Sequence, residues 1–154
     1  MRTKTTLILI CAAAMLPFLP MRAVAVDTMP TPAMSPEHAA GKKAIEAKDW
    51  NAAVKALTAA AQRDARNADV QNLLGYAYRN AGKLDLAFQH YKRALQLDPR
   101  HIGTHEYIGE AYLMVNNLAK AEEHLAMLKR HCPGYCEEYD DLNKKISEYR
   151  ARNR

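Results

Sequence analysis

The most reactive side chains of this sequence belong to two cysteines that lie close together near the C-terminus. Cys132 and Cys136 are separated by three residues, and Pro133 and Gly134 turn the chain between them. In an oxidising compartment such a pair favours a structural disulfide. Two thiolates beside His131 could instead bind copper or zinc, and a cysteine at a helix N-terminus has the lowered pKa that thiol redox chemistry needs. The spacing is not the C-x-x-C of thioredoxin-like proteins, so the pattern favours the disulfide and leaves redox or metal chemistry as the alternative.

Two histidines form a second candidate site. His101 and His105 are four residues apart, a spacing with which one helix face can bind zinc. A third ligand and the glutamate of an H-E-x-x-H motif are lacking, so we expect His101 at a helix cap, His105 in packing, and no metal. The sequence also contains no glycine-rich phosphate loop and no Ser/His/Asp set. It therefore predicts no catalytic residue, no cofactor and no enzyme activity.

The first 25 residues have the pattern of a secretory signal peptide. Arg2 and Lys4 give a positive start, residues 5–16 are an apolar stretch of signal-peptide length, and Ala-Val-Ala precedes the expected cleavage after Ala25. This predicts export to the bacterial periplasm. An uncleaved anchor, or lipidation at Cys11, is the alternative. No later apolar run is long enough to cross a bilayer, so we expect no membrane span after cleavage.

The charge of the chain argues against nucleic-acid binding. The formal net charge is +5, but three of the cations lie in the predicted signal, which leaves 19 basic against 17 acidic side chains. Domains that bind nucleic acid carry a much stronger basic bias. We therefore expect a protein or peptide partner and no nucleic acid.

The mature sequence repeats itself every 34 residues. A period of 34 with small and large residues at fixed places predicts helical hairpins that stack on one another. We expect helices near 35–47, 50–63, 67–80, 84–96, 101–114 and 118–131, with an amphipathic capping helix from 136 to 152 and a flexible leader at 26–34. The residues that recur are Gly41, Gly75 and Gly109; Ala53, Ala87 and Ala121; and Leu57, Tyr91 and Leu125.

Within this period the chain resembles the tetratricopeptide-repeat (TPR) family. Residues 68–101 contain LGYAY followed by AFQHYKRALQLDP, and residues 102–135 contain IGEAYL followed by AKAEEHLAMLKRHCP. Residues 34–67 are a weaker copy. HEYIGEAYL followed by CPGYCEEYDDL is also similar to a group of small exported bacterial TPR proteins. The resemblance implies an all-α solenoid of three hairpins with a C-terminal capping helix at 136–154.

The resemblance also implies a function, which is to bind a protein or peptide in a concave groove lined by the first helix of each hairpin. Arg79 and Asn80 could take a carboxylate or a carbonyl, while Glu106 and Glu110 would favour a basic partner. Oligomeric state stays open. The implied groove residues are Lys42, Asp69, Asn72, Tyr76, Arg79, Asn80, Glu106, Glu110 and Met114, with His38, Asp140 and Lys144 beside them.

Overall fold

The computed structural model describes residues 34–153, and this part of the chain is entirely helical. The predicted signal at 1–25 and the leader at 26–34, except Met34, lie outside the described residues. None of the described helices is both long enough and apolar enough to span a bilayer. The helices are α1 (Pro36–Glu46), α2 (Trp50–Arg63), α3 (Ala68–Asn80), α4 (Leu84–Leu97), α5 (Ile102–Met114), α6 (Leu118–His131) and α7 (Glu137–Arg152). The prediction of an all-α fold with seven helices is confirmed.

Polar side chains cap the N-termini of α1, α3 and α5, the first helices of the three hairpins. The Ser35 hydroxyl accepts a hydrogen bond from the backbone N–H of His38, and the Asn67 amide oxygen accepts one from Val70, each at 3.1 Å. His101 caps α5 with its ring, because Nδ1 accepts from the backbone N–H of Thr104 at 3.1 Å. These bonds satisfy N–H groups that have no partner inside the helix.

The turns inside the hairpins also follow the 34-residue period. Lys48, Gly82 and Asn116 are 34 residues apart, and each has a positive φ, of 56°, 74° and 56°. Glycine and asparagine adopt this left-handed backbone readily, so the residue types of Gly82 and Asn116 suit these turns. Lys48 shows that the hairpin geometry imposes the same conformation on a residue that does not favour it.

The recurring glycines lie where two helices approach closely. A Cβ atom on Gly75 would lie 2.5 Å from the ring of Tyr91 in the second helix of the same hairpin, and Gly41 is equally close to the corresponding leucine of α2. The third copy differs, because a Cβ on Gly109 would meet Leu142 of α7 at 2.6 Å. Because the side chain that packs against Gly109 comes from α7, the capping helix is packed tightly onto the last hairpin.

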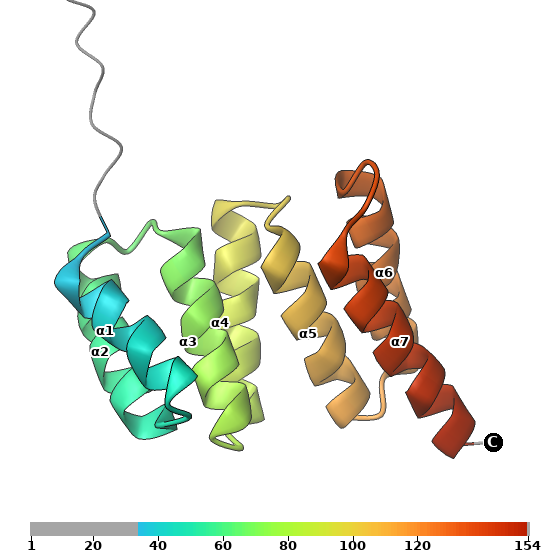
Figure 1. The fold of residues 1–154 in the computed structure, drawn as a ribbon, viewed down its shortest axis with the longest axis horizontal. Helices are drawn as coiled ribbons and strands as arrows, with labels where there is room; N and C mark the ends of the chain where they lie inside the picture. Colours follow the sequence, from blue (N-terminus) through green and yellow to red (C-terminus); the bar gives the residue numbers. More distant parts are fainter. Residues whose placement is uncertain (1–33, 154) are drawn as a thin grey trace, which may run out of the picture. The chain divides into compact units, whose positions relative to one another are not determined.

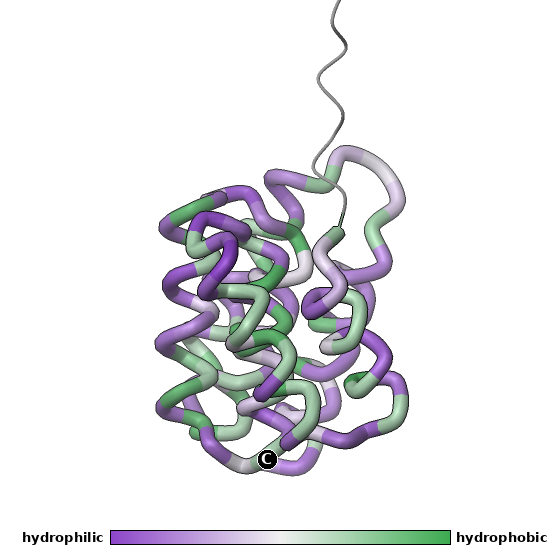
Figure 2. Tube along the Cα trace, turned by 90° about the vertical axis from the view of Figure 1, so that its left-hand side faces the viewer, coloured by the Kyte–Doolittle hydropathy of each residue, from purple (hydrophilic) through white to green (hydrophobic). Residues whose placement is uncertain are grey.

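The core of the described residues is a series of three clusters, two between neighbouring hairpins and one between the last hairpin and α7. Buried alanines and larger residues such as Leu57, Tyr91 and Leu128 fill them. Figure 2 shows the consequence along the chain, where hydrophobic and hydrophilic stretches alternate within each helix. Each helix therefore turns one face to its neighbours and one to solvent.

The hairpins stack in chain order, so that the first helices form a continuous wall. Figure 1 shows α1, α3, α5 and α7 side by side. Contacts join α1 to α3, α3 to α5 and α5 to α7. The second helix of each hairpin contacts the helix that follows it in the chain, so that α2 contacts α3, α4 contacts α5 and α6 contacts α7. We call the surface formed by α1, α3, α5 and α7 the groove wall.

Candidate functional site

Aromatic side chains from successive elements form a row on the groove wall. Tyr76 of α3 lies between Trp50 of α2 and Tyr107 of α5, with ring centroids 6.1 Å and 4.8 Å away. The guanidinium of Arg79 lies 5.2 Å from the Tyr76 centroid and 5.4 Å from that of Tyr107. Tyr107 was not among the predicted groove residues, since the repeat pattern gives no signal for it. The row fixes α3 against α5 and holds Arg79 in place.

Arg79 is committed to interactions inside the protein. Its side chain is 9% exposed, Nη1 lies 2.5 Å from Oε2 of Glu110, and the same nitrogen donates to the Tyr107 carbonyl at 3.2 Å. The ion pair joins residues 31 positions apart in the chain. Arg79 therefore stabilises the contact of α3 with α5, and its charge is already compensated by Glu110.

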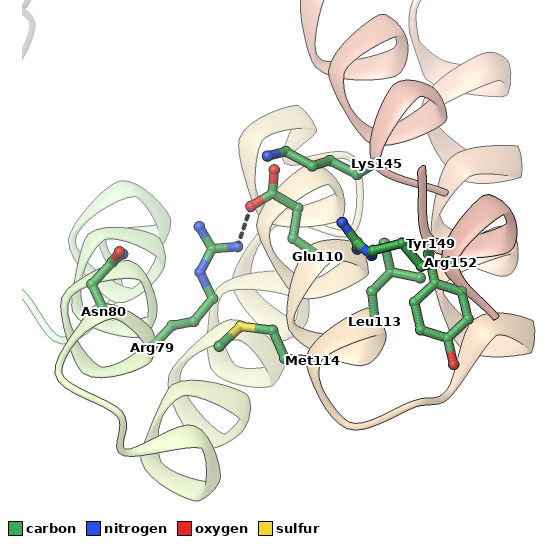
Figure 3. A pocket seen from close by; sticks show the side chains of 8 residues that line it. All are labelled: Arg79, Asn80, Glu110, Leu113, Met114, Lys145, Tyr149 and Arg152. Carbon is green, nitrogen blue, oxygen red and sulfur yellow. Dashed lines mark hydrogen bonds and ion pairs between the residues drawn. The ribbon is translucent and has the colours of Figure 1, made fainter. Parts of the chain in front are cut away.

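A pocket of about 420 Å³ lies on the groove wall near the C-terminal ends of α3, α5 and α7. Met114 on its edge is 55% exposed. Lys145 and Arg152 form no ion pair with any residue in the range 34–153. Figure 3 shows the lining side chains coming together from the three helices, with the Arg79–Glu110 pair on one side. The lining residues are Arg79, Asn80, Glu110, Leu113, Met114, Lys145, Tyr149 and Arg152.

Glu106 lies one helical turn before Glu110 on α5, and its surroundings are different. Its side chain is 9% exposed and has no hydrogen bond or ion pair within the described part of the chain. Burial first, and then the nearby carboxylates of Glu110, Asp141 and Glu138, together raise the pKa of Glu106 to about 8, against a smaller opposing effect of Arg79. This carboxyl group is therefore the one groove-wall acid in residues 34–153 that is both buried and without a partner.

The other predicted groove residues divide into exposed and engaged side chains. Lys42 is exposed. Asp69 accepts a hydrogen bond from Nε2 of His101 at 2.9 Å, and Asn80 donates to a carbonyl of its own helix at 2.8 Å. Asn72 is buried, with an amide oxygen that has no hydrogen-bond partner among residues 34–153. The neighbouring positions follow the same division, with His38 buried and Asp140 and Lys144 exposed.

A histidine cluster between α5 and α6 was not predicted. His105 is buried as expected, but its Nδ1 lies 2.9 Å from Nδ1 of His124, and its Nε2 lies 3.1 Å from the Pro99 carbonyl. His131 stacks on His105 at 6.0 Å, and Tyr112 stacks on His124 at 5.6 Å. Burial and the neighbouring His105 lower the pKa of His124 to about 4. Both rings are therefore neutral at pH 7, and one Nδ1 donates to the other.

The two cysteines lie together at the junction of α6 and α7. Their sulfur atoms form a close pair, and their Cα atoms are 5.8 Å apart, which is the usual separation for a disulfide. Cys136 precedes α7 directly, and the Glu138 carboxylate lies 3.6 Å from its sulfur. The donor atoms of Cys132, Cys136 and Glu138 all lie within 4.8 Å of one another. The geometry therefore suits a disulfide, and in the reduced state it offers three ligand atoms to a metal.

Solved structures with the same arrangement of helices confirm the class of fold. The TPR2B domain of yeast Sti1 in a pHsp70 complex superposes with a TM-score of 0.67 at 23% identity, covering 73% of this chain and 94% of that one. The Yersinia enterocolitica type III secretion chaperone SycD, in complex with a peptide of the translocator YopD, gives 0.67 at 16% identity, covering 77% and 92%. The Sgt2 TPR domain from Aspergillus fumigatus gives 0.69 at 18% identity, covering 80% and 81%. Antiparallel hairpins stacked behind a wall of first helices make this chain a helical-repeat protein.

Sequence comparison identifies the repeat. The profile of the tetratricopeptide repeat family matches residues 68–101. The uncharacterized protein ycf37 of Guillardia theta is 36% identical over 63 residues, which are 40% of this chain and 35% of that protein. The human protein O-mannosyl-transferase TMTC3 is 28% identical over 85 residues, 55% of this chain but 9% of the transferase. The chain thus spans only a small part of these relatives. Residues 68–101 thus match one tetratricopeptide repeat by sequence, and the fold of the described residues is that of solved TPR domains.

Proposed function

We propose that this protein is a non-enzymatic scaffold that binds a segment of another protein on its groove wall. The observation that carries the proposal is the pocket on the wall, which combines the exposed Met114 with Lys145 and Arg152, two cations that form no ion pair within residues 34–153. An apolar centre with a polar rim is the usual composition of a protein-binding site. A TPR domain of Sti1 has been solved in a complex with pHsp70, and the secretion chaperone SycD, which has the same fold, has been solved with a YopD peptide.

Site-specific photocrosslinking tests this proposal without disturbing the fold. A photoreactive amino acid replaces Met114, and in a control variant it replaces Leu86, an exposed apolar residue of α4. We expect crosslinked partners from the envelope fraction at position 114 and none at 86. Equal crosslinking at both positions, or none at either, contradicts the groove-wall assignment.

We further propose that the protein is exported to the periplasm and that Cys132 and Cys136 are oxidised there. The support is the signal-like sequence at residues 1–25 and the close sulfur pair. The N-terminus of the protein purified from an envelope fraction should be Val26. Intact mass with and without thiol alkylation should show two protected thiols. Uncleaved protein that still begins with Met1 and is found in the soluble cytoplasmic fraction contradicts the export proposal.

A second candidate function is metal or thiol handling by the cysteine pair. It is favoured by the position of Glu138, whose carboxylate completes a set of three donor atoms with the two sulfurs. Zinc and copper prefer such thiolate-containing sites. Titrating zinc into the fully reduced protein tests this candidate, and the zinc affinity of the Glu138→Gln variant is compared with that of the wild type. A disulfide that resists mild reductant, together with no metal uptake after reduction, rules this candidate out.

A further inference from the structure

We propose that the groove wall binds a lysine or arginine side chain of the partner segment against the carboxyl group of Glu106. This inference rests on the proposed function, because it names the chemistry of the partner that the wall accepts. Glu106 of α5 is 9% exposed, it forms no hydrogen bond or ion pair with any residue in the range 34–153, and the charges that act on it come from α3, α5 and α7. A buried carboxyl group without a partner costs free energy that a bound cation can recover.

The charges around Glu106 select a cation. Glu110 lies on the same helix and Glu138 and Asp141 on α7, whereas Arg79 of α3 is the one cation among the charges that act on Glu106. The guanidinium of Arg79 is already bonded to Glu110. The site therefore has an excess of negative charge, which repels anionic partners and attracts an ammonium or guanidinium group.

The arrangement of the same acids disfavours a metal ion as the occupant. The one group of three His, Cys, Asp or Glu donors within 4.8 Å of one another in the described residues is that of Cys132, Cys136 and Glu138. Glu106 and Asp141 do not belong to it. Acids spread over two helices suit a long, flexible cationic side chain, since it can reach one buried carboxyl group while its alkyl stem lies along the wall.

Binding of the cation is coupled to the release of a proton. Because the pKa of Glu106 is about 8, roughly nine-tenths of the molecules carry a neutral carboxyl group at pH 7. A bound ammonium group favours the ionised form, so the proton leaves to solvent. The affinity for a cationic segment should therefore rise up to about tenfold per pH unit below pH 8 and level off above it.

The position of the pocket gives the spacing of the partner's side chains. Glu106 and Met114 are eight residues apart on α5, which is about 12 Å along the helix axis. An extended segment covers that distance in about four residues, and side chains at i and i+4 point to the same side. The preferred segment thus has a basic residue and an apolar residue four positions apart.

Capped heptapeptides test the inference. The probe is Ala-Lys-Ala-Ala-Ala-Leu-Ala, with versions in which arginine, glutamine or glutamate replaces the lysine. Binding is followed by NMR chemical-shift changes between pH 6 and pH 9. We expect the lysine or arginine peptide to bind at least about tenfold more tightly than the glutamine and glutamate peptides at pH 8. The affinity of the cationic peptide should also rise with pH.

Matched variants assign the effect to one residue. Glu106→Gln removes the charge with little change of shape and should abolish both the cation preference and the pH dependence. Glu123→Gln removes an exposed charge from α6 and should change neither. Equal binding of the lysine and glutamine peptides, retention of the preference in Glu106→Gln, or no binding of any peptide overturns the inference.

The crosslinking at Met114 separates this inference from the proposed function. If Glu106→Gln leaves the crosslinked partner and its yield unchanged, the groove wall still binds a partner and only the cation site is wrong. If crosslinking at Met114 itself fails, the proposed function is wrong. Concentration-dependent sedimentation of both proteins identifies a second copy as the occupant, and a dimer that Glu106→Gln dissociates overturns the assignment to a partner segment.

Discussion

Replacing Glu106 by glutamine should stabilise the protein at alkaline pH. The pKa of Glu106 is about 8 in the folded protein, against 4.5 in the absence of burial and neighbouring charges. The folded state therefore binds more protons than the unfolded state between these two values, and folding free energy is lost as the pH rises from 4.5 to 8. Glutamine has a similar shape and does not ionise, so the variant does not lose this part of the stability.

The size of the effect follows from the shift of the pKa. At about 1.4 kcal/mol per unit, the full shift corresponds to an upper limit of about 5 kcal/mol. The side chain keeps some exposure, and water and local relaxation reduce the penalty, so we expect about 1–3 kcal/mol above pH 8. Near pH 4.5 the two proteins should be equally stable within a few tenths of a kcal/mol.

Urea unfolding followed by circular dichroism measures this difference at pH 5, 7 and 9. The Glu123→Gln control removes an exposed ion pair with Lys120 and should change stability by less than about 1 kcal/mol at any pH. A Glu106→Gln variant that is less stable than the wild type at pH 9 would refute the reasoning. So would a difference between the two proteins that does not grow with pH.

Three further perturbations test the packing, the histidines and the cysteines. Gly75→Ala should destabilise the fold by about 1–3 kcal/mol, because the added methyl group overlaps an aromatic ring of α4, whereas Gly103→Ala, with room for a Cβ, should be neutral or stabilising; urea midpoints compare the two. The pKa of His124 is about 4 in the folded state against 6.5 when exposed, so stability is present above pH 6.5 and is lost as the pH falls towards 4. His124→Phe should remove about 1–3 kcal/mol of that loss, measured as the difference in unfolding free energy between pH 7 and pH 4.5, and an unchanged slope would contradict the assignment. If the cysteines are bonded, Cys132→Ser with Cys136→Ser should cost about 2 kcal/mol for so short a loop; a variant as stable as the oxidised wild type would show that the pair adds nothing.

The sequence was sufficient to predict the helices because the helix boundaries depend on local signals that recur. Ser35 and Asn67 cap helices with their own side chains, and Gly82 and Asn116 favour the left-handed turn. A helix boundary depends on a few adjacent residues, so it can be predicted without knowledge of the rest of the fold. The positive φ of Lys48 was not predicted, since its residue type alone argues against that conformation and only its place in the 34-residue period points to it.

The partners of the groove side chains could not be predicted in the same way. The repeat register places Arg79 and Glu110 on adjacent first helices, but it does not show that they bond to each other while Glu106, one turn away, is left alone. Contacts of this kind depend on rotamers and on the packing of α7. The same holds for His105 and His124, which are 19 residues apart and meet through their Nδ1 atoms.

The period itself connects Glu106 with the rest of the groove wall. His38, Asn72 and Glu106 are 34 residues apart and are all buried, each on a first helix. The Asn72 amide oxygen is fully buried and has no hydrogen-bond partner within residues 34–153. Glu106 also forms no hydrogen bond there, although its carboxyl oxygens are not fully buried. Apolar side chains at these places would be cheaper for folding alone, since buried polar groups without partners reduce stability. The polar residues are understandable if a bound partner supplies donors, since the Asn72 amide oxygen is an acceptor and the Glu106 carboxylate becomes one once it has released its proton. A partner segment rich in N–H donors, with a cationic side chain for Glu106, is the chemistry that satisfies them together.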